Sequence, residues 1–136
     1  MTFIQGVSGA LIHNGKVLVV RRHKDDDFLA GYYELPGGKI DPGETHHQAL
    51  EREFLEEVSL RVKAIKHYRD FTYQPGPNTS CVDYEYTVEL APGEKIENLK
   101  LSFEHDDYKW VDLPELEKLV PITDEKVTSI QLALAG

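Results

Sequence analysis

The most informative segment of the sequence runs from Gly38 to Leu60 and reads GKIDPGETHHQALEREFLEEVSL. Its second part predicts a helix over residues 45–58, because apolar residues recur every four positions and therefore share one side. These residues are Leu50, Phe54 and Val58. Thr45 and Gln48 have the spacing of a capping box, which marks the start of that helix. The segment is thus a turn-rich loop that leads into an amphipathic helix.

Three acidic side chains lie on one face of this predicted helix. Glu53, Glu56 and Glu57 are spaced i, i+3 and i+4, so a period of 3.6 residues brings their carboxylates together. Like charges this close repel each other, and partial burial beside the apolar stripe strengthens the repulsion. A solvated acidic surface is one interpretation. The glycine-rich loop at 36–44, whose backbone can approach a ligand closely, favours the other, a site for a hard divalent cation such as Mg²⁺.

The whole segment resembles the Nudix box. The fixed positions of that motif are matched in order and spacing by Gly38, Glu44, Arg52, Glu53, Glu56 and Glu57. Ser59 is the one departure, because the family usually has glycine there. Glycine would end the helix in a left-handed conformation that costs serine about 1 kcal/mol, so a strained or reshaped helix end is expected. The flanks are similar too, with Tyr33-Glu34-Leu35-Pro36 before the box and an aromatic stretch at 108–111.

The resemblance implies both a fold and a metal site. The fold is α/β, a Nudix-type α/β/α sandwich with a mixed β-sheet, formed by a single domain over residues 1–136. The implied ligands of Mg²⁺ or Mn²⁺ are Glu53, Glu56, Glu57 and the Gly38 carbonyl. Arg52 is implied to pair with Glu44 and so hold the loop against the helix. An ion pair within the helix, from Arg52 to Glu56, is the competing interpretation.

The implied reaction is metal-dependent hydrolysis of a diphosphate linkage, because bound cations neutralise phosphate oxygens and lower the pKa of an attacking water. The substrate would be a nucleoside diphosphate linked to another group, such as a nucleoside triphosphate, an oxidised nucleotide or ADP-ribose. The catalytic base would be a carboxylate near the metal cluster: Glu53, Glu56 or a residue from another loop. Glu104 is the candidate from another loop, and a plain surface acid is the alternative there.

Candidates for substrate binding lie around the box. Lys39 follows the glycines, and Arg21 or Arg22 ends a predicted strand near the same loop, so these cations are candidates for contact with phosphate. Three aromatic rings are candidates for stacking on a nucleobase, with core packing as the alternative: Tyr33, Phe71 and Tyr73. The chosen substrate-binding set is Arg21, Tyr33 and Lys39.

Turn signals divide the rest of the chain into short strands and helices. Asn14-Gly15 predicts a tight hairpin between two strands within residues 5–22. Further strands are predicted at 32–35, 62–73, 81–90 and 108–111, with an exposed loop at 24–30 and breaks at 36–38, 74–80 and 91–93. Helices are expected to start at Asp112 and Thr123. The clean alternation within 81–90 indicates a half-buried strand, with Glu85 on its polar face.

Composition narrows the class of partner. A formal net charge of -9 repels polymeric nucleic acid and anionic membranes, so neither is expected, whereas a small nucleotide is compatible if cations screen its phosphates. The N-terminal residues lack the pattern of a secretory signal and no apolar run reaches the roughly 20 residues of a membrane span, so a cytoplasmic location is expected. Cys81 is the single cysteine and is expected to be a buried strand thiol. Oligomeric state stays open.

Two other classes of function are compatible with parts of this pattern. A catalytically inactive Nudix-fold ligand sensor or interaction module should have lost one of the three clustered glutamates, and all three are present. A Ca²⁺-binding or acidic interaction domain leaves the glycine loop unexplained and lacks the twelve-residue EF-hand pattern. An active pyrophosphohydrolase is therefore the preferred hypothesis.

Overall fold

The computed structural model describes residues 1–136 as seven strands, three α-helices and one short 3₁₀ helix. In chain order these are β1 Thr2–His13, β2 Lys16–Arg22, β3 Tyr33–Glu34, β4 Gly37–Lys39, α1 His46–Val58, β5 Val62–Gly76, β6 Thr79–Leu90, η1 Ile96–Asn98, β7 His105–Val111, α2 Leu113–Lys118 and α3 Asp124–Ala135. No helix combines the length and apolar character needed to cross a bilayer.

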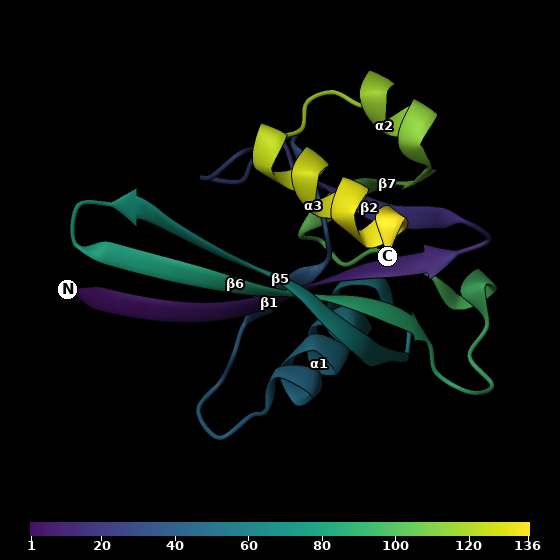
Figure 1. The fold of residues 1–136 in the computed structure, drawn as a ribbon, viewed down its shortest axis with the longest axis horizontal. Coiled ribbons are helices and arrows are strands. Elements are labelled where there is room, and N and C mark those ends of the chain that lie inside the picture. Colours follow the sequence, from purple (N-terminus) through teal and green to yellow (C-terminus); the bar gives the residue numbers. More distant parts are fainter.

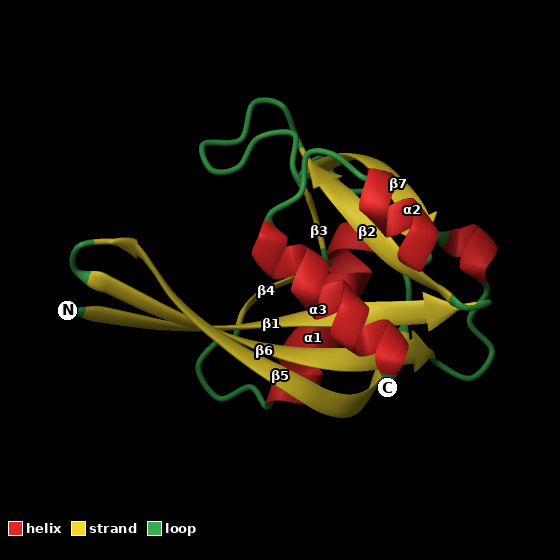
Figure 2. Ribbon diagram, turned by 45° about the horizontal axis from the view of Figure 1, so that its top comes forward, coloured by secondary structure: helices red, strands yellow, loops and turns green.

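The strands form one mixed sheet around the long first strand (Figure 2). Its main order is β3-β2-β1-β6-β5, with β4 added to β1 and β7 added to β2. β1 pairs in parallel with β6 and antiparallel with β2 and β4. β1 therefore joins two groups of strands and belongs to both.

Helices cover both faces of the sheet, with α1 on one side and α2 and α3 on the other (Figure 1). Two buried apolar clusters fill the two interfaces. One contains Leu50, Phe54 and Val58 of α1 packed on Val7 and Leu18 of the sheet. The other contains residues of the α2/α3 layer and the opposite side of the same strands: Ala10, Val17, Val19, Leu116 and Ile130. The predicted α/β/α sandwich with a mixed sheet is confirmed.

Local signals in the sequence account for the turns and helix starts. Asn14 and Gly15 adopt positive φ angles of 53° and 77° in the β1–β2 hairpin, as a tight primed turn requires. Thr45 caps α1 and forms the reciprocal capping box with Gln48. The starts of the last two helices are capped as expected, by Asp112 and by Thr123.

The end of α1 has the left-handed conformation that the sequence indicated. Ser59 has φ 60° and ψ 27°, which is the conformation that glycine adopts at a helix end. The serine contributes something that glycine does not, because its hydroxyl donates a hydrogen bond of 3.1 Å to the Lys100 carbonyl. This bond offsets part of the strain and ties the end of α1 to the loop before β7.

The predicted break at 36–38 is wrong, because Gly37 and Gly38 form strand β4. They pair antiparallel with Ser8 and Val7 of β1. A side chain at Gly37 would place its Cβ 2.1 Å from the Val7 carbonyl oxygen, so only glycine allows this approach. These glycines therefore add a short strand to the sheet and do not interrupt the regular structure.

The region around the β5–β6 hairpin also differs from its prediction. The sequence predicts a break at 74–80, but only residues 77–78 lie between the two strands. β5 continues past its proline with a shift in strand register between Tyr73 and Gly76. The prediction that β6 is half-buried is wrong, because Glu85, on its expected polar face, is buried, as is Cys81 on the same side of the strand. The burial of Cys81 agrees with expectation. Glu85 is buried because α3 covers this face of β6, and Ser129 of α3 contacts the Glu85 carboxylate.

Packing between α1 and the sheet gives a test of this arrangement. A Cβ on buried Gly9 would lie 2.6 Å from Cε1 of Phe54 and 3.1 Å from a methyl of Val88. We expect Gly9→Ala to lower the free energy of unfolding by about 1–3 kcal/mol, because the buried ring has no free space to move into. Gly76→Ala is the matched control, since no atom lies within 4 Å of the added Cβ. Equal losses in urea unfolding of both variants would contradict this packing.

Candidate active site

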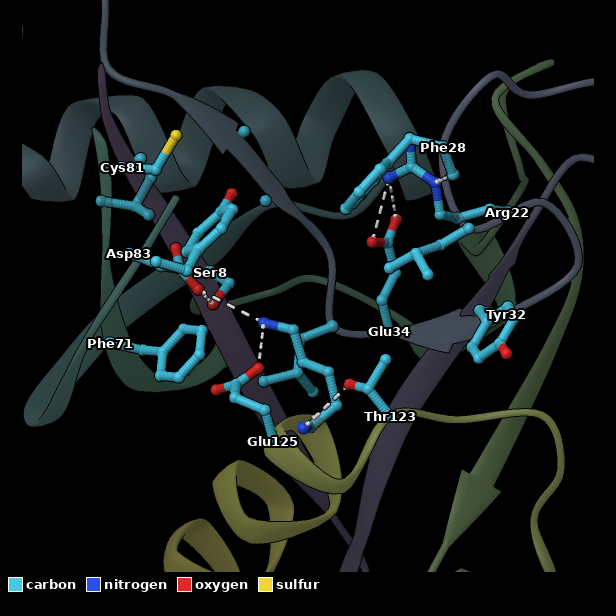
Figure 3. A pocket seen from close by; sticks show the side chains of 18 of the residues that line it. Ser8, Arg22, Phe28, Tyr32, Glu34, Phe71, Cys81, Asp83, Thr123 and Glu125 are labelled. Atoms are coloured by element: carbon cyan, nitrogen blue, oxygen red, sulfur yellow. Dashed lines mark hydrogen bonds and ion pairs between the residues drawn. The ribbon is translucent and has the colours of Figure 1, made fainter. Parts of the chain in front are cut away.

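A cavity of about 500 Å³ opens between the glycine strand β4, the central strands and the start of α3. Figure 3 shows Arg22, Glu34 and Phe28 on one side of it, and Ser8, Asp83 and Phe71 on the other. Gly37, Gly38 and Lys39 also line the cavity, so the first half of the box reaches this site. Its size suits a drug-sized or nucleotide-sized ligand.

The three clustered glutamates differ in burial. Glu57 is almost completely buried, at 2% exposure, while the side chains of Glu53 and Glu56 are 13% and 53% exposed. A Cβ on Gly38 would lie 2.5 Å from Cδ of Glu53, so the glycine is required for Glu53 to pack against β4. The expected meeting of glycine loop and acidic face is present.

Glu57 lies in an environment that opposes its negative charge. Its Oε1 accepts one long hydrogen bond, of 3.5 Å, from the Gly37 amide. The pKa of Glu57 is raised to about 10, mainly by burial and in addition by the nearby carboxylates of Glu53, Glu104 and Glu34. A cation beside these carboxylates would reverse that effect, so the donor set fits a hard divalent ion.

Arg52 makes both of the contacts that the sequence left open. Its guanidinium donates two hydrogen bonds to Glu44, of 2.7 and 2.9 Å, and one of 3.1 Å to the Lys39 carbonyl. It also donates within the helix to Glu53 at 3.0 Å and to Glu56 at 3.2 Å. Arg52 holds the pKa of Glu44 at about 2, so this acid stays ionised.

The contacts of Arg52 also orient the carboxylates of Glu53 and Glu56. No three carboxylate or imidazole groups are arranged around a single point that would suit a metal ion. Glu53 and Glu56 both face the guanidinium of Arg52, while Glu57 is turned inward beneath β4. Binding of an ion by all three would require their side chains to turn toward one point.

Glu104 lies close enough to the cluster for its charge to raise the pKa of Glu57. Its side chain is exposed, and its carbonyl accepts a hydrogen bond from the His23 amide. The next residue, His105, is buried and was not singled out from the sequence. Its Nε2 lies 2.9 Å from a Glu34 carboxylate oxygen, and its Nδ1 lies 3.9 Å from Glu57 without a hydrogen-bond partner. The only sequence signal for Glu34 was its place in the flank of the box.

The two arginines at the end of β2 point to opposite sides of the sheet, as alternation requires. Arg22 lines the cavity, whereas Arg21 does not line it and pairs instead with Asp106 at 2.6 Å. The guanidinium of Arg22 donates to the Glu34 carboxylate at 3.1 Å and to the Phe28 carbonyl at 2.7 Å. The structure therefore places Arg22, and not the preferred Arg21, in the lining of the cavity.

The other substrate-binding candidates have different surroundings. Lys39 lines the cavity and its side chain is exposed. Tyr33 also borders the cavity, but it belongs to the apolar cluster beneath α2 and α3 and its hydroxyl donates to Asp107 at 2.8 Å. Phe71 and Tyr73 line the cavity as a stacked pair, with ring centroids 5.6 Å apart.

Comparison with known families gives one match to nearly the whole chain. The family model of the NUDIX domain matches residues 4–131. A putative 8-oxo-dGTP diphosphatase 2 of Mycobacterium tuberculosis is 48% identical over 56 residues, which cover 41% of this chain and 39% of that protein. The chain thus spans about two fifths of the length of this relative. An RNA pyrophosphohydrolase of Bartonella quintana is 33% identical over 132 residues, covering 79% of this chain and 75% of that protein.

Solved structures show the same fold. A MutT protein from Methanosarcina mazei has a TM-score of 0.80 at 22% identity, covering 96% of this chain and 91% of its own. The ORF135 protein of Escherichia coli has a TM-score of 0.79 at 24% identity, covering 99% and 91%.

The buried carboxylate gives a prediction for the metal-free protein. Between its ordinary pKa of 4.5 and the folded value of about 10, the folded state keeps a proton that the unfolded chain has released. Stability therefore falls as pH rises through that window, by roughly 1 kcal/mol per pH unit. Glu57→Gln removes this titration, so in EDTA the variant should match the wild type at pH 4 and exceed its stability at pH 8.

Urea unfolding at pH 4, 6 and 8 measures this difference. Glu117→Gln, at an exposed acid of α2, is the control and should show no such trend. A wild type whose stability relative to Glu57→Gln is the same at all three pH values would contradict the buried environment of Glu57.

Proposed function

Because the chain belongs to the Nudix family, whose domain model matches residues 4–131, we propose that residues 1–136 act as one metal-dependent pyrophosphohydrolase domain. Its substrate is a nucleoside diphosphate linked to another group. The observation that supports this most directly is the buried carboxylate of Glu57 beside Glu53, both packed against the β4 glycines. The same glycines line the cavity, whereas the glutamates lie behind them and do not line it. Relatives named diphosphatases and pyrophosphohydrolases support the same reaction class.

Members of the family generally use divalent metal ions. Here Glu53, Glu56 and Glu57, with the Gly38 carbonyl, would hold Mg²⁺ or Mn²⁺. Such ions neutralise phosphate charge and lower the pKa of a bound water. Arg52 keeps Glu53 and Glu56 close together and, through Glu44 and Lys39, keeps the loop in place. The geometry of the acids thus depends on one arginine with five donors in a fixed fork.

The chain's own side chains divide the remaining tasks. A carboxylate at the edge of the cluster, from Glu53, Glu56 or the exposed Glu104, takes the proton of the attacking water. Arg22 and Lys39 line the same cavity as the glycines, which supports assigning them to contact with phosphate oxygens. The stacked pair of Phe71 and Tyr73 offers an aromatic surface of the cavity to a planar group of the ligand.

The metal ligands can be tested with paired variants of α1. We expect Glu56→Gln to lower metal-dependent hydrolysis by roughly 10²-fold or more, because it removes a ligand or base without changing size. Glu51→Gln, five residues earlier on α1, is the control and should keep wild-type activity. A rise in melting temperature on addition of Mn²⁺, present in wild type and lost in Glu56→Gln, provides a measurement independent of turnover. Full activity of Glu56→Gln would refute this assignment.

The substrate can be narrowed by measuring phosphate release from a panel. The panel contains nucleoside triphosphates, oxidised nucleotides, ADP-ribose, nucleotide sugars, dinucleoside polyphosphates and a short 5′-triphosphorylated RNA. Because the net charge of -9 repels long anionic chains, we expect the small nucleotides to react faster than the RNA. The RNA is included because one relative is named an RNA pyrophosphohydrolase. Inactivity on the whole panel would favour a ligand sensor instead.

A further inference from the structure

A network of buried and half-buried charges forms part of the cavity wall where β6 meets the start of α3 and continues behind that wall. We call it the ion network; it consists of Arg69 of β5, Asp83 and Glu85 of β6, and Glu125 and Lys126 of α3. Asp83, Glu125 and Lys126 line the cavity, while Arg69 and Glu85 lie behind them. In Figure 3, Asp83 and Glu125 face the cavity close to Ser8 and Phe71. Nothing in the proposed hydrolytic step uses these residues.

Lys126 is the cation of the network that reaches the cavity. Its ammonium group lies 3.3 Å from Asp83, 3.6 Å from Glu85 and 3.8 Å from Glu125. Only the contact with Asp83 is a hydrogen bond, and Asp83 also accepts a bond of 2.7 Å from the Ser8 hydroxyl. Lys126 therefore has donors left for an acceptor atom on a ligand.

Glu85 is the unusual member, because it is completely buried. Its Oε1 accepts a bond of 2.7 Å from the Ser129 hydroxyl, which in turn contacts the Tyr68 hydroxyl at 2.9 Å. Arg69 lies 3.5 Å from the same oxygen. Oε2 has no hydrogen-bond partner and faces Lys126. A buried carboxylate with an unsatisfied oxygen is costly, and this oxygen faces Lys126, which points to a role toward that lysine.

The charge of the network depends on Glu85. With every group ionised, three carboxylates face two cations, and the network carries one net negative charge. Protonation of Glu85 makes the ion network neutral. Burial raises the pKa of Glu85 to about 7, because the charges of Asp83 and Glu125 add to desolvation and outweigh the effects of Lys126 and Ser129.

We propose that Glu85 is a positioning residue of the ligand cavity: ionised, it holds Lys126 back within the network, and protonated, it frees Lys126 to donate a hydrogen bond to a ligand. This inference rests on the proposed use of the cavity for a nucleotide. The ligand group that Lys126 meets is a hydrogen-bond acceptor on a planar ring, because Phe71 and Tyr73 line the same part of the cavity. Glu85 touches no ligand itself and acts only through Lys126.

Binding without turnover tests this role. Dissociation constants of the four nucleoside 5′-monophosphates are measured in EDTA from pH 6 to 8.5, for wild type, Glu85→Gln and the control Glu89→Gln. The ligand phosphate titrates with a pKa near 6, but it does so equally for all three proteins and cancels in their ratio. Gln mimics the protonated acid, so wild type and Glu85→Gln should bind equally at pH 6. At pH 8.5 wild type should bind about three- to tenfold more weakly, whereas Glu89→Gln should follow wild type throughout.

A second measurement uses the wild type alone. If ligand prefers the protonated form, saturation with the tightest monophosphate must raise the titration midpoint of Glu85, followed by carboxyl ¹³C NMR, by about 0.5–1 pH unit. An unchanged midpoint, or a wild-type to Glu85→Gln ratio that is constant with pH, overturns the role of Glu85 even if hydrolysis proceeds. If none of the three proteins binds a monophosphate, both the role of Glu85 and the proposed use of the cavity are overturned.

Discussion

The close approach of the Gly37–Gly38 backbone to β1 and to α1 is the constraint on which the rest of this structure depends. On one side, a Cβ at Gly37 would collide with a carbonyl of β1, and on the other, a Cβ at Gly38 would collide with Glu53. Two residues without side chains therefore let a sheet, a loop and an acidic helix meet within van der Waals distance. The arrangement buries the Glu57 carboxylate, and the proposed cation would offset the cost of that burial.

The sequence predicted most reliably what is local. The capping pair Thr45 and Gln48, the apolar stripe of α1 and the Asn14-Gly15 turn each depend on neighbours within four residues, and all are present in the structure. The same is true of the acidic face, whose members share one side of a helix wherever that helix packs. The contact of Arg52 with Glu44 needed the resemblance, since spacing alone described an intrahelical pair equally well.

What could not be predicted depends on partners distant in the chain. Alternation in β6 identified two faces but not that α3, some forty residues later, would cover the second, so Glu85 looked like a solvated acid. In β2 the same alternation separated Arg21 from Arg22 without showing which side holds the cavity. Gly37 and Gly38 looked like a break because their strand partner is thirty residues earlier. In each case tertiary contacts, not local preference, determine the outcome.

The parallel pairing of β1 with β6 has a consequence for biosynthesis. Thr2 pairs with Thr79 and Leu11 with Val88, so β1 has no partner along most of its length until residues 79–88 have emerged from the ribosome. During that interval α1 is already complete, yet the surface it packs against is not. The nascent chain therefore exposes Leu50, Phe54 and Val58 together with an unpaired apolar strand, the kind of intermediate that chaperones bind. Delaying β6, by slow codons placed before residue 79, would lengthen that exposure without changing a single atom of the finished protein.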